Sequence, residues 1–595
     1  MKKQSSWNII IFFIKTVWYY GSAYCLLALP QIIISSLQPF IMVFFPKQLI
    51  DGLIENKDLK EILWTAGLMI LSLLIVRILN PLLQYFNTKA YNDLTFRIKA
   101  EMGTKAMSLE YKELENNETL DLINRVQETF QVDIMFEALI GIVSNLITLL
   151  GLIVLIAQLN IFIVIAIIIV VLVNVFCNRA SKKYEYQWQK DAAPYQRRFS
   201  YILSLMYNFV FGKEIRVNRL QEEIKDKYNR EVEIYSINLN KIILKFLNLN
   251  VLRNLVSVLQ DLFLYLYLII SAKAKRITIG DFTMFVNAAN SLTNALVGIT
   301  SSFIELEQQV RYVKDFKRFM EMEKKQSKET AHPKYDYTKG ITFDDVSFRY
   351  PGSKKNALKH ISIEIKPGEK LSVVGLNGAG KTTFVKLLTK LYCTEKGRIE
   401  LHGVDVNEID DEEYMKNFSI VFQDFQLFAF SLKENIILNN GYDRKRIYDT
   451  IQKTGLNQKV DSLPKKLETQ IFKIFDPDGV ELSGGESQKV ALARSYYKDA
   501  DIIILDEPTS ALDPLAEYEI YRQFDELVQN KTAIYISHRL SSCRFCDKIA
   551  VFQEGCIVQY GTHDGLLTED GLYRDMFTKQ SGFYTDMADT IQESV

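Results

Sequence analysis

The sequence predicts an all-α bundle of six membrane-spanning helices followed by an α/β domain built on a parallel sheet. Two observations support this fold class. Residues 1–310 contain six apolar stretches long enough to cross a bilayer, whereas residues 341–580 contain short apolar strands that end in glycine-rich or acidic loops. The hydrophobic content of 48% is therefore the average of two different halves. Lys and Arg together number 71, as do Asp and Glu, so no basic excess indicates a nucleic-acid partner.

The six apolar stretches meet the length requirement of a bilayer. A hydrocarbon core about 30 Å thick needs about twenty mostly apolar residues per helix. The predicted spans are 18–46, 62–86, 133–158, 160–178, 248–272 and 281–306. The start of the chain resembles a signal peptide, but Lys15 interrupts its apolar run and no small-residue cleavage site follows. We therefore expect an interfacial helix that leads into the first span.

Charge predicts the topology of the spans. The loops after the second and fourth spans are long and polar, and their Lys and Arg residues gather at 97–125 and 179–230. The positive-inside rule places both loops, and with them both termini, in the cytoplasm. Lys273, Lys275 and Arg276 in the last outer loop run against the rule but are few. The sequence thus predicts a multi-pass protein of the plasma (cytoplasmic) membrane, in contact with the lipid bilayer.

Both long loops have apolar residues at helical intervals, so the spans are expected to continue as helices beyond the bilayer. At their far ends, 109–123 and 211–220 are candidate contact segments for the second half of the chain, and solvated loops are the alternative. Within the spans, Asn287, Asn290 and Asn294 share one face of the sixth helix. That face either lines a substrate path or forms interhelical hydrogen bonds. The same two readings apply to Arg77, Asn145, Asn174, Arg253, Gln260 and Asp261.

Composition also predicts the domain boundaries. Residues 311–325 are charged with interleaved apolar positions, which indicates a helix leaving the membrane, and 326–339 are polar with Pro333 before Gly340. The expected organisation is a transmembrane domain at 1–310, a linker at 311–340, an α/β domain at 341–580 and a C-terminal tail at 581–595.

Residues 375–383 match the phosphate-loop pattern GxxxxGK[ST] and lie between an apolar strand and a stretch of helical spacing. Glycine N–H groups and the positive end of a helix dipole form a cradle for the polyphosphate of ATP. The Lys381 ammonium would reach the β- and γ-phosphates, and the Thr382 hydroxyl would ligate Mg²⁺. The predicted cradle consists of Gly375, Leu376, Asn377, Gly378, Ala379, Gly380, Lys381, Thr382 and Thr383.

Two further strands are expected to deliver catalytic groups. The apolar run 502–505 ends in Asp506 and Glu507, as expected of a central parallel strand that carries carboxylates at its carboxyl end. Asp506 would hold Mg²⁺, and Glu507 would polarise the water that attacks the γ-phosphate. His538 follows the strand at 532–536 and would orient that water. A lone histidine is more often structural, but its place at the end of a third matching strand favours the catalytic interpretation.

A second anion cradle is predicted at 482–488, another helix start rich in small residues and N–H donors. Its candidate ligand-binding residues are Ser483, Gly484, Gly485 and Glu486. One monomer does not need two cradles for one nucleotide. If the second cradle caps the ATP of another copy, the enzyme works as a head-to-tail pair with ATP between the subunits.

These motifs, in this order, resemble the ATP-binding cassette (ABC) family. The matching segments are Walker A at 375–382, Gln423 within 421–424, the LSGG signature at 482–485, Walker B at 502–507, the D-loop at 510–513, and His538. Six spans ahead of one cassette resemble an exporter half-transporter, known as the type I exporter or type IV ABC fold. The resemblance implies that Tyr350 stacks on adenine, that Gln423 senses Mg²⁺ and the attacking water, and that Asp513 links the two sites of a dimer.

Two positions depart from the family pattern. Glu486 stands where the signature usually has Gln, and Asp-Pro-Asp-Gly at 476–479 replaces the acidic-glycine pattern common before it. Since Glu507 and His538 are both present, whereas paired transporters with one dead site often lose such residues, a homodimer is favoured over a heterodimer.

The resemblance implies an ATP-driven exporter that moves an amphipathic peptide, lipid or drug-like substrate by alternating access. An importer for metal chelators on the same fold is one alternative. An ATP-gated channel or regulator is another, which Glu507 disfavours because a gate needs no hydrolytic residue. The overall similarity is to bacterial peptide, lantibiotic-type or multidrug exporters.

Overall fold

The computed structural model describes residues 6–157, 198–322, 334–507, 531–537 and 540–580, together with Val528 and individual residues between 169 and 195. The chain forms two compact units. The first comprises Met1–Met107 and Asp121–Met322, and the second comprises Ser108–Leu120 and Glu323–Val595. Residues 108–120 thus belong with the second unit although both of their flanks belong to the first.

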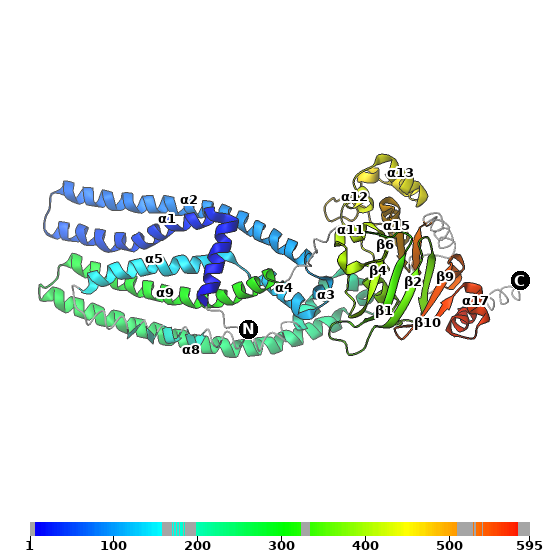
Figure 1. Ribbon diagram of the computed structural model, residues 1–595. Helices are drawn as coiled ribbons and strands as arrows, with labels where there is room; N and C mark the ends of the chain where they lie inside the picture. Colours follow the sequence, from blue (N-terminus) through cyan, green and yellow to red (C-terminus); the bar gives the residue numbers. More distant parts are fainter. Residues whose placement is uncertain are drawn as a thin grey trace. The chain divides into compact units, whose positions relative to one another are not determined.

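The described part of the first unit is helical (Figure 1). Its elements are α1 (Ser6–Ile54), α2 (Leu59–Met107), most of α4 (Asn117–Thr129), α5 (Val132–Ala157), η1 (Phe209–Phe211), α7 (Gly212–Val217), α8 (Gln221–Lys273) and α9 (Ile279–Met320). The 49 residues of α2 extend over about 73 Å at the usual helical rise, more than twice the bilayer core. The spans therefore continue as helix beyond the membrane, as predicted.

Within the described residues, α1, α2, α5 and α8 are long and apolar enough to cross a membrane. They contain the predicted spans at 18–46, 62–86 and 248–272, and the predicted span at 133–158 up to residue 157, the last described residue of α5. The span predicted at 160–178 lies mostly outside the described residues. The span predicted at 281–306 lies in α9, which is helical. Its described residues contain no stretch as apolar as those of the other four, because Asn, Thr and Ser side chains interrupt the apolar run.

The N-terminal arm of α1 bends away from the rest of the helix at Gly21, where the backbone leaves helical geometry (Figure 1). A Cβ at this position would lie 3.0 Å from Cδ1 of Leu94, so the bend packs closely against α2. One face of the arm is buried, with Ile9, Ile10, Phe13 and Val17, and another leaves large apolar side chains exposed, with Trp7, Ile11, Ile14 and Trp18. This pattern suits a helix that lies in the membrane interface.

The second unit contains two sheets. An antiparallel sheet has the order β2-β1-β4-β5, formed by β1 (Ile341–Phe348), β2 (Leu358–Ile365), β4 (Lys396–Leu401) and β5 (Val404–Asp405). The other has the order β10-β9-β3-β8-β7-β6, formed by β3 (Lys370–Gly375), β6 (Phe418–Val421), β7 (Ile502–Asp506), β8 (Thr532–Ile536), β9 (Lys548–Gln553) and β10 (Cys556–Gly561). Only β10 pairs antiparallel in the second sheet, so the predicted parallel sheet is confirmed.

The second unit also contains helices, most of which lie between strands in the sequence (Figure 1). They are α3 (Tyr111–Leu114), α10 (Lys381–Leu388), η2 (Val406–Glu408), α11 (Asp411–Lys416), α12 (Leu432–Ile437), α13 (Arg444–Lys453), α14 (Asn457–Ser462), η3 (Lys466–Glu468), α15 (Gly484–Lys498), η4 (Leu540–Phe545) and α17 (His563–Thr568). Helix α10 packs between the two sheets, because the Phe384 ring stacks on Phe343 of β1 at 4.4 Å and contacts Phe552 of β9 at 5.7 Å. The core of the unit therefore holds α10 in place.

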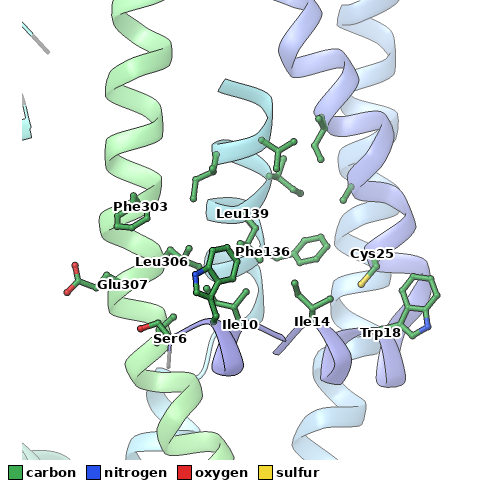
Figure 2. A pocket seen from close by; sticks show the side chains of 17 residues that line it. Ser6, Ile10, Ile14, Trp18, Cys25, Phe136, Leu139, Phe303, Leu306 and Glu307 are labelled. Atoms are coloured by element: carbon green, nitrogen blue, oxygen red, sulfur yellow. The ribbon is translucent and has the colours of Figure 1, made fainter. Parts of the chain in front are cut away.

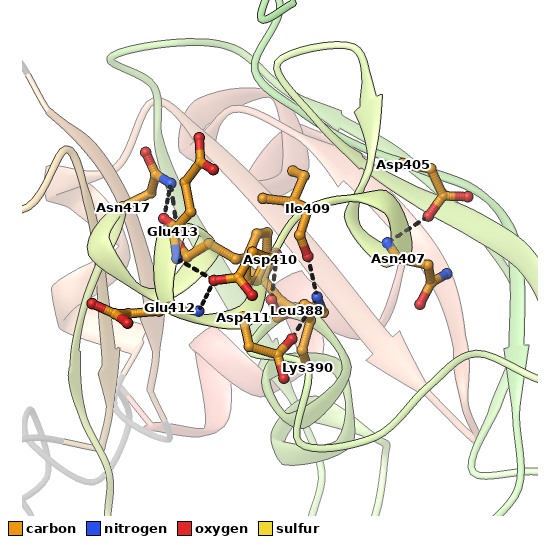
Figure 3. Close-up of polar contacts among 11 residues, drawn as sticks. Leu388, Lys390, Asp405, Asn407, Ile409, Asp410, Asp411, Glu412, Glu413 and Asn417 are labelled. Carbon is orange, nitrogen blue, oxygen red and sulfur yellow. Dashed lines mark hydrogen bonds and ion pairs between the residues drawn. The ribbon is translucent and has the colours of Figure 1, made fainter. Parts of the chain in front are cut away.

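Polar contacts fasten the end of α10 to the segment before β6 (Figure 3). Lys390 forms an ion pair with Asp411 at 2.7 Å, and the Tyr414 hydroxyl donates to the Leu388 carbonyl at 2.6 Å. Because β6 leads directly to Gln423, these contacts hold α10 and the approach to Gln423 together as one block.

Candidate nucleotide site

The predicted cradle is a loop from β3 to α10 whose backbone conformation requires glycine at two positions. Gly375 has φ +152° and Gly380 has φ +108°, in the region that L side chains rarely adopt. A Cβ on Gly375 would also lie 2.2 Å from the backbone oxygen of Phe552. The structure places residues 375–383 together on this loop and on the first turn of α10.

The Lys381 side chain is buried against its own loop. Its Nζ donates to the carbonyls of Gly375 at 2.9 Å and Leu376 at 3.2 Å. Burial lowers the pKa of Lys381, and the charges of Glu507 and Asp506 oppose this effect. The ammonium thus lies against the phosphate loop and interacts electrostatically with both carboxylates.

Asp506 ends β7 with only 2% of its surface exposed. Its Oδ1 is buried and, among the described residues, accepts no hydrogen bond. Burial raises the pKa of Asp506 to about 6, with a further upward contribution from Glu507 and Asp424 and a downward one from Lys381. A buried carboxylate oxygen without a donor is costly, and a divalent cation would relieve that cost.

The residues present fit Mg²⁺ shared with a nucleotide better than a metal held by protein alone. Within the described residues, no group of three or more His, Cys, Asp or Glu side chains could hold a metal ion. Mg²⁺ commonly takes one or two protein ligands and completes its shell with phosphate oxygens and water. Asp506 and the Thr382 hydroxyl at the start of α10 could supply such a pair.

Glu507 and Gln423 come together although 84 positions separate them. The Gln423 Nε2 donates to Oε2 of Glu507 at 2.7 Å. Glu507 itself has φ +47°, and its backbone N–H donates to the Ile536 carbonyl of β8 at 3.0 Å. Such strained residues cluster at functional sites, since the surrounding structure must hold them in place. The structure thus unites Gln423, Glu507 and Asp506 at one edge of the sheet.

Tyr350 lies beside the first turn of α10. Its hydroxyl shares a hydrogen bond with Oγ1 of Thr383 at 3.1 Å, and its ring meets Tyr392 edge to face at 5.3 Å. Lys386 Nζ lies 5.5 Å from the Tyr350 ring centroid. Sequence reasoning missed Lys386 and Tyr392. The only signal was that Lys386 follows Thr383 by three residues, which places both on one side of the helix.

Ser483 is the N-cap of α15, and Glu486 completes a capping box with it. Ser483 Oγ accepts from the Glu486 N–H, and the Ser483 N–H donates to Glu486 Oε2 at 2.8 Å. Lys459 pairs with the other carboxylate oxygen at 3.0 Å. Burial raises the pKa of Glu486, but the bonds from Ser483 and the Lys459 charge together hold it below its ordinary value. The departure from the family pattern at 486 thus has a local structural reason.

Some predicted residues are not joined in this structure. Among the described residues, no hydrogen bond or ion pair links 483–486 to 375–383. His538 and the predicted D-loop at 510–513 lie outside the described residues.

The first unit contains an apolar groove of about 870 Å³ between α1, α5 and α9. Figure 2 shows Ile10 and Trp18 of the N-terminal arm, Phe136 of α5 and Leu306 of α9 around it, with the Glu307 carboxylate at one side. Such a lining can take the apolar part of an amphipathic molecule.

Of the α9 asparagines, Asn287 forms an interhelical hydrogen bond, and the substrate-path reading stays a prediction. The Asn287 amide donates to the Met42 carbonyl of α1 at 3.1 Å, which is an interhelical bond. Asn290 and Asn294 are exposed in this chain. Gln260 likewise bonds Thr293 across helices at 3.3 Å.

Known proteins match both units. The ABC transporter transmembrane region family matches residues 24–296, and the ABC transporter family matches 358–510. The subtilin transport ATP-binding protein SpaT of Bacillus subtilis is 28% identical over 91% of this chain and 89% of its own length. The nisin transport ATP-binding protein NisT of Lactococcus lactis subsp. lactis is 28% identical over 84% of this chain and 85% of its own.

Two other similarities are less complete or less close. An ATP-dependent lipid A-core flippase of Methylobacillus flagellatus is 34% identical, but over only 53% of this chain and 54% of its own length. The solved structure of a bacterial Atm1-family ABC exporter with ATP bound superposes with a TM-score of 0.77 at 22% identity, covering 94% of this chain and 98% of that one. The structural match shows the fold.

Proposed function

Since the chain belongs to the ABC transporters and is a multi-pass, ATP-driven membrane exporter, we propose that it works as a homodimer that exports a lantibiotic-type amphipathic peptide. The observation that carries this proposal is the likeness to the subtilin and nisin transport proteins, which extends over both units, whereas the flippase match covers about half of the chain. The apolar groove between α1, α5 and α9 supports an amphipathic substrate.

The proposed chemistry assigns a role to each residue of the site. The loop 375–383 binds the phosphates of ATP, with Lys381 on the β- and γ-phosphates, and the Tyr350 ring supports the adenine. Thr382, Asp506 and Gln423 would hold Mg²⁺, which when bound neutralises charge on the phosphate oxygens.

Glu507 is the proposed general base, and Gln423 positions it. Because Gln423 donates its amide N–H to Glu507, the two lone pairs of its amide oxygen stay available for Mg²⁺ and for the attacking water. The Glu507 carboxylate can then polarise that water. His538 would hold the γ-phosphate from the end of β8.

The dimer completes the site. In the proposed assembly Ser483, Gly484, Gly485 and Glu486 of one copy close over the ATP bound by the other, at the positive end of α15. We call residues 341–580 the ATPase domain. ATP closes the ATPase domains of the two copies and hydrolysis reopens them, so that the membrane helices expose the substrate alternately to each side. We place the protein in the plasma membrane with both termini in the cytoplasm. The grouping of residues 108–120 with the ATPase domain supports that side for the loop after the second span.

Reconstituted protein tests the proposed function. In inverted vesicles, ATP should drive a subtilin-type precursor peptide into the lumen, and the peptide should stimulate hydrolysis. Glu507→Gln should still bind ATP but stop both activities. Stimulation by lipid A or cationic drugs without any response to the peptide would refute the substrate class. Movement out of inverted vesicles would support the importer alternative instead.

A further inference from the structure

Lys386 of α10 occupies a cage of tyrosines. Its Nζ lies 5.5 Å from the ring centroid of Tyr111, 5.5 Å from that of Tyr350 and 5.7 Å from that of Tyr392. A cation over aromatic faces at such distances is attracted by the ring electrons, more strongly when water is partly excluded. Three rings around one ammonium fix its position.

Glu115 closes the cage. Its Oε1 pairs with Lys386 Nζ at 3.0 Å, and its Oε2 accepts from the Tyr392 hydroxyl. Burial works against the Lys386 charge, yet Glu115 holds the pKa of Lys386 above its ordinary value. The lysine is therefore a cation that bridges α10 to residues far away in sequence.

The cage joins two functionally different parts of the second unit. Tyr111 and Glu115 belong to the segment 108–120, which connects α2 to α4. Tyr350, on the other side, is the proposed adenine support and bonds Thr383 of the cradle. An adenine base that stacks on Tyr350 would press on its ring, and the Lys386 ammonium rests against that same ring.

We propose that this cage reports adenine binding to segment 108–120, with Lys386 as a positioning residue that links the two. The inference rests on the proposed nucleotide site but adds a distinct claim, namely that the base, and not the phosphates alone, alters the segment that connects α2 to α4. Because the Lys386 ammonium contacts the ring of Tyr350 on which the base would stack, we attribute the link to the adenine ring.

Hydrogen exchange on the full-length Glu507→Gln protein in lipid nanodiscs tests this link. We expect saturating ATP to change the exchange rate of amides 108–120 by about threefold or more, and tripolyphosphate, which has no base, to leave it unchanged. Lys386→Gln should abolish the ATP response while ATP affinity stays within about twofold, because Lys386 is not a proposed ligand of the nucleotide.

Lys390→Gln is the matched control. Lys390 also forms an ion pair, with Asp411, and also lies over a ring, that of Tyr414 at 5.3 Å, but it is outside the cage. The control should keep the response of 108–120. Glu115→Gln should weaken the response, and the exchange of charges in Glu115→Lys with Lys386→Glu should restore part of it. This double variant shows that a loss in Lys386→Gln is not mere misfolding.

The possible failures are distinguishable. Equal responses to ATP and tripolyphosphate, or an unchanged response in Lys386→Gln, would overturn the inference while leaving the nucleotide site intact. A parent protein that binds no ATP would overturn the proposed nucleotide site and the inference together.

Discussion

The buried carboxylate of Asp506 makes the proposed nucleotide site sensitive to pH. Its pKa is raised to about 6, chiefly by burial, so the folded protein favours the protonated form. The stability that this group contributes is present below its ordinary pKa of 3.8 and is lost as pH rises through about 6. Cation binding depends on pH in the opposite direction, because the ionised carboxylate of Asp506 is a metal ligand and its protonated form is not.

We expect the Mg²⁺-dependent part of nucleotide affinity to fall up to about tenfold per pH unit below pH 6. Titration with a non-hydrolysable ATP analogue, with and without Mg²⁺, measures it. Asp424→Asn should shift the fall to lower pH, since Asp424 raises the pKa of Asp506. Asp506→Asn should show no such fall, and a flat profile in the unmodified protein would contradict the assignment.

Glu486 gives a second prediction at this scale. Glu486→Gln keeps a capping-box side chain but removes a negative charge beside the proposed γ-phosphate contact. We expect the KM for ATP to fall by about two- to fivefold, because an unfavourable charge interaction is removed. Lys459→Gln, which removes the paired cation, should shift KM in the other direction. An unchanged KM in both variants would place this helix start away from bound ATP.

At the scale of elements, the glycine turn of the phosphate loop is set by sterics. Gly375→Ala would place a Cβ 2.2 Å from the Phe552 oxygen of β9 at φ +152°. We expect a loss of several kcal/mol in the unfolding free energy of the ATPase domain, because backbone must move in β9. Gly352→Ala is the control, as Gly352 also has a positive φ but open space around it. That control should cost about 1–2 kcal/mol. Similar melting temperatures for both would contradict the steric argument.

Some elements could be predicted from the sequence and others could not. The strand, loop and helix around Lys381 were predictable because their pattern lies in consecutive residues, and the same holds for β7, which ends in Asp506. The antiparallel sheet of β1, β2 and β4 was not predicted, since it has no comparable local pattern. The pairing of Lys386 with Glu115 joins residues 271 positions apart, which no local pattern could reveal.

At the scale of the whole molecule, the positions of the membrane helices could be predicted from the lengths of apolar stretches. The contacts between those helices could not. Composition alone located four spans that lie in helices long and apolar enough to cross a membrane. The predicted span in α9 is helical, but its polar residues leave it less apolar than those four. The segment 109–123 was predicted to meet the second half, and the structure groups 108–120 with it. The contact predicted for the segment 211–220 stays a prediction. Helix α7 forms within this segment, and its Val217 is 81% exposed. In the proposed homodimer, a second copy is available to contact it.

A mixed dimer tests that assembly. Lys381→Ala disables the phosphate loop of one copy, and Ser483→Arg disables the signature of the other, so each variant alone should be inactive. If each site combines Lys381 of one copy with Ser483 of its partner, the mixed dimer holds one intact site. An equal mixture should then recover ATPase activity, up to about a quarter of normal if pairing is random and the sites are independent. The double variant Lys381→Ala with Ser483→Arg, mixed with unmodified protein, provides the control in which no mixed dimer has an intact site. Recovery in the first mixture requires that the two halves of a site come from different chains, because neither chain contains both.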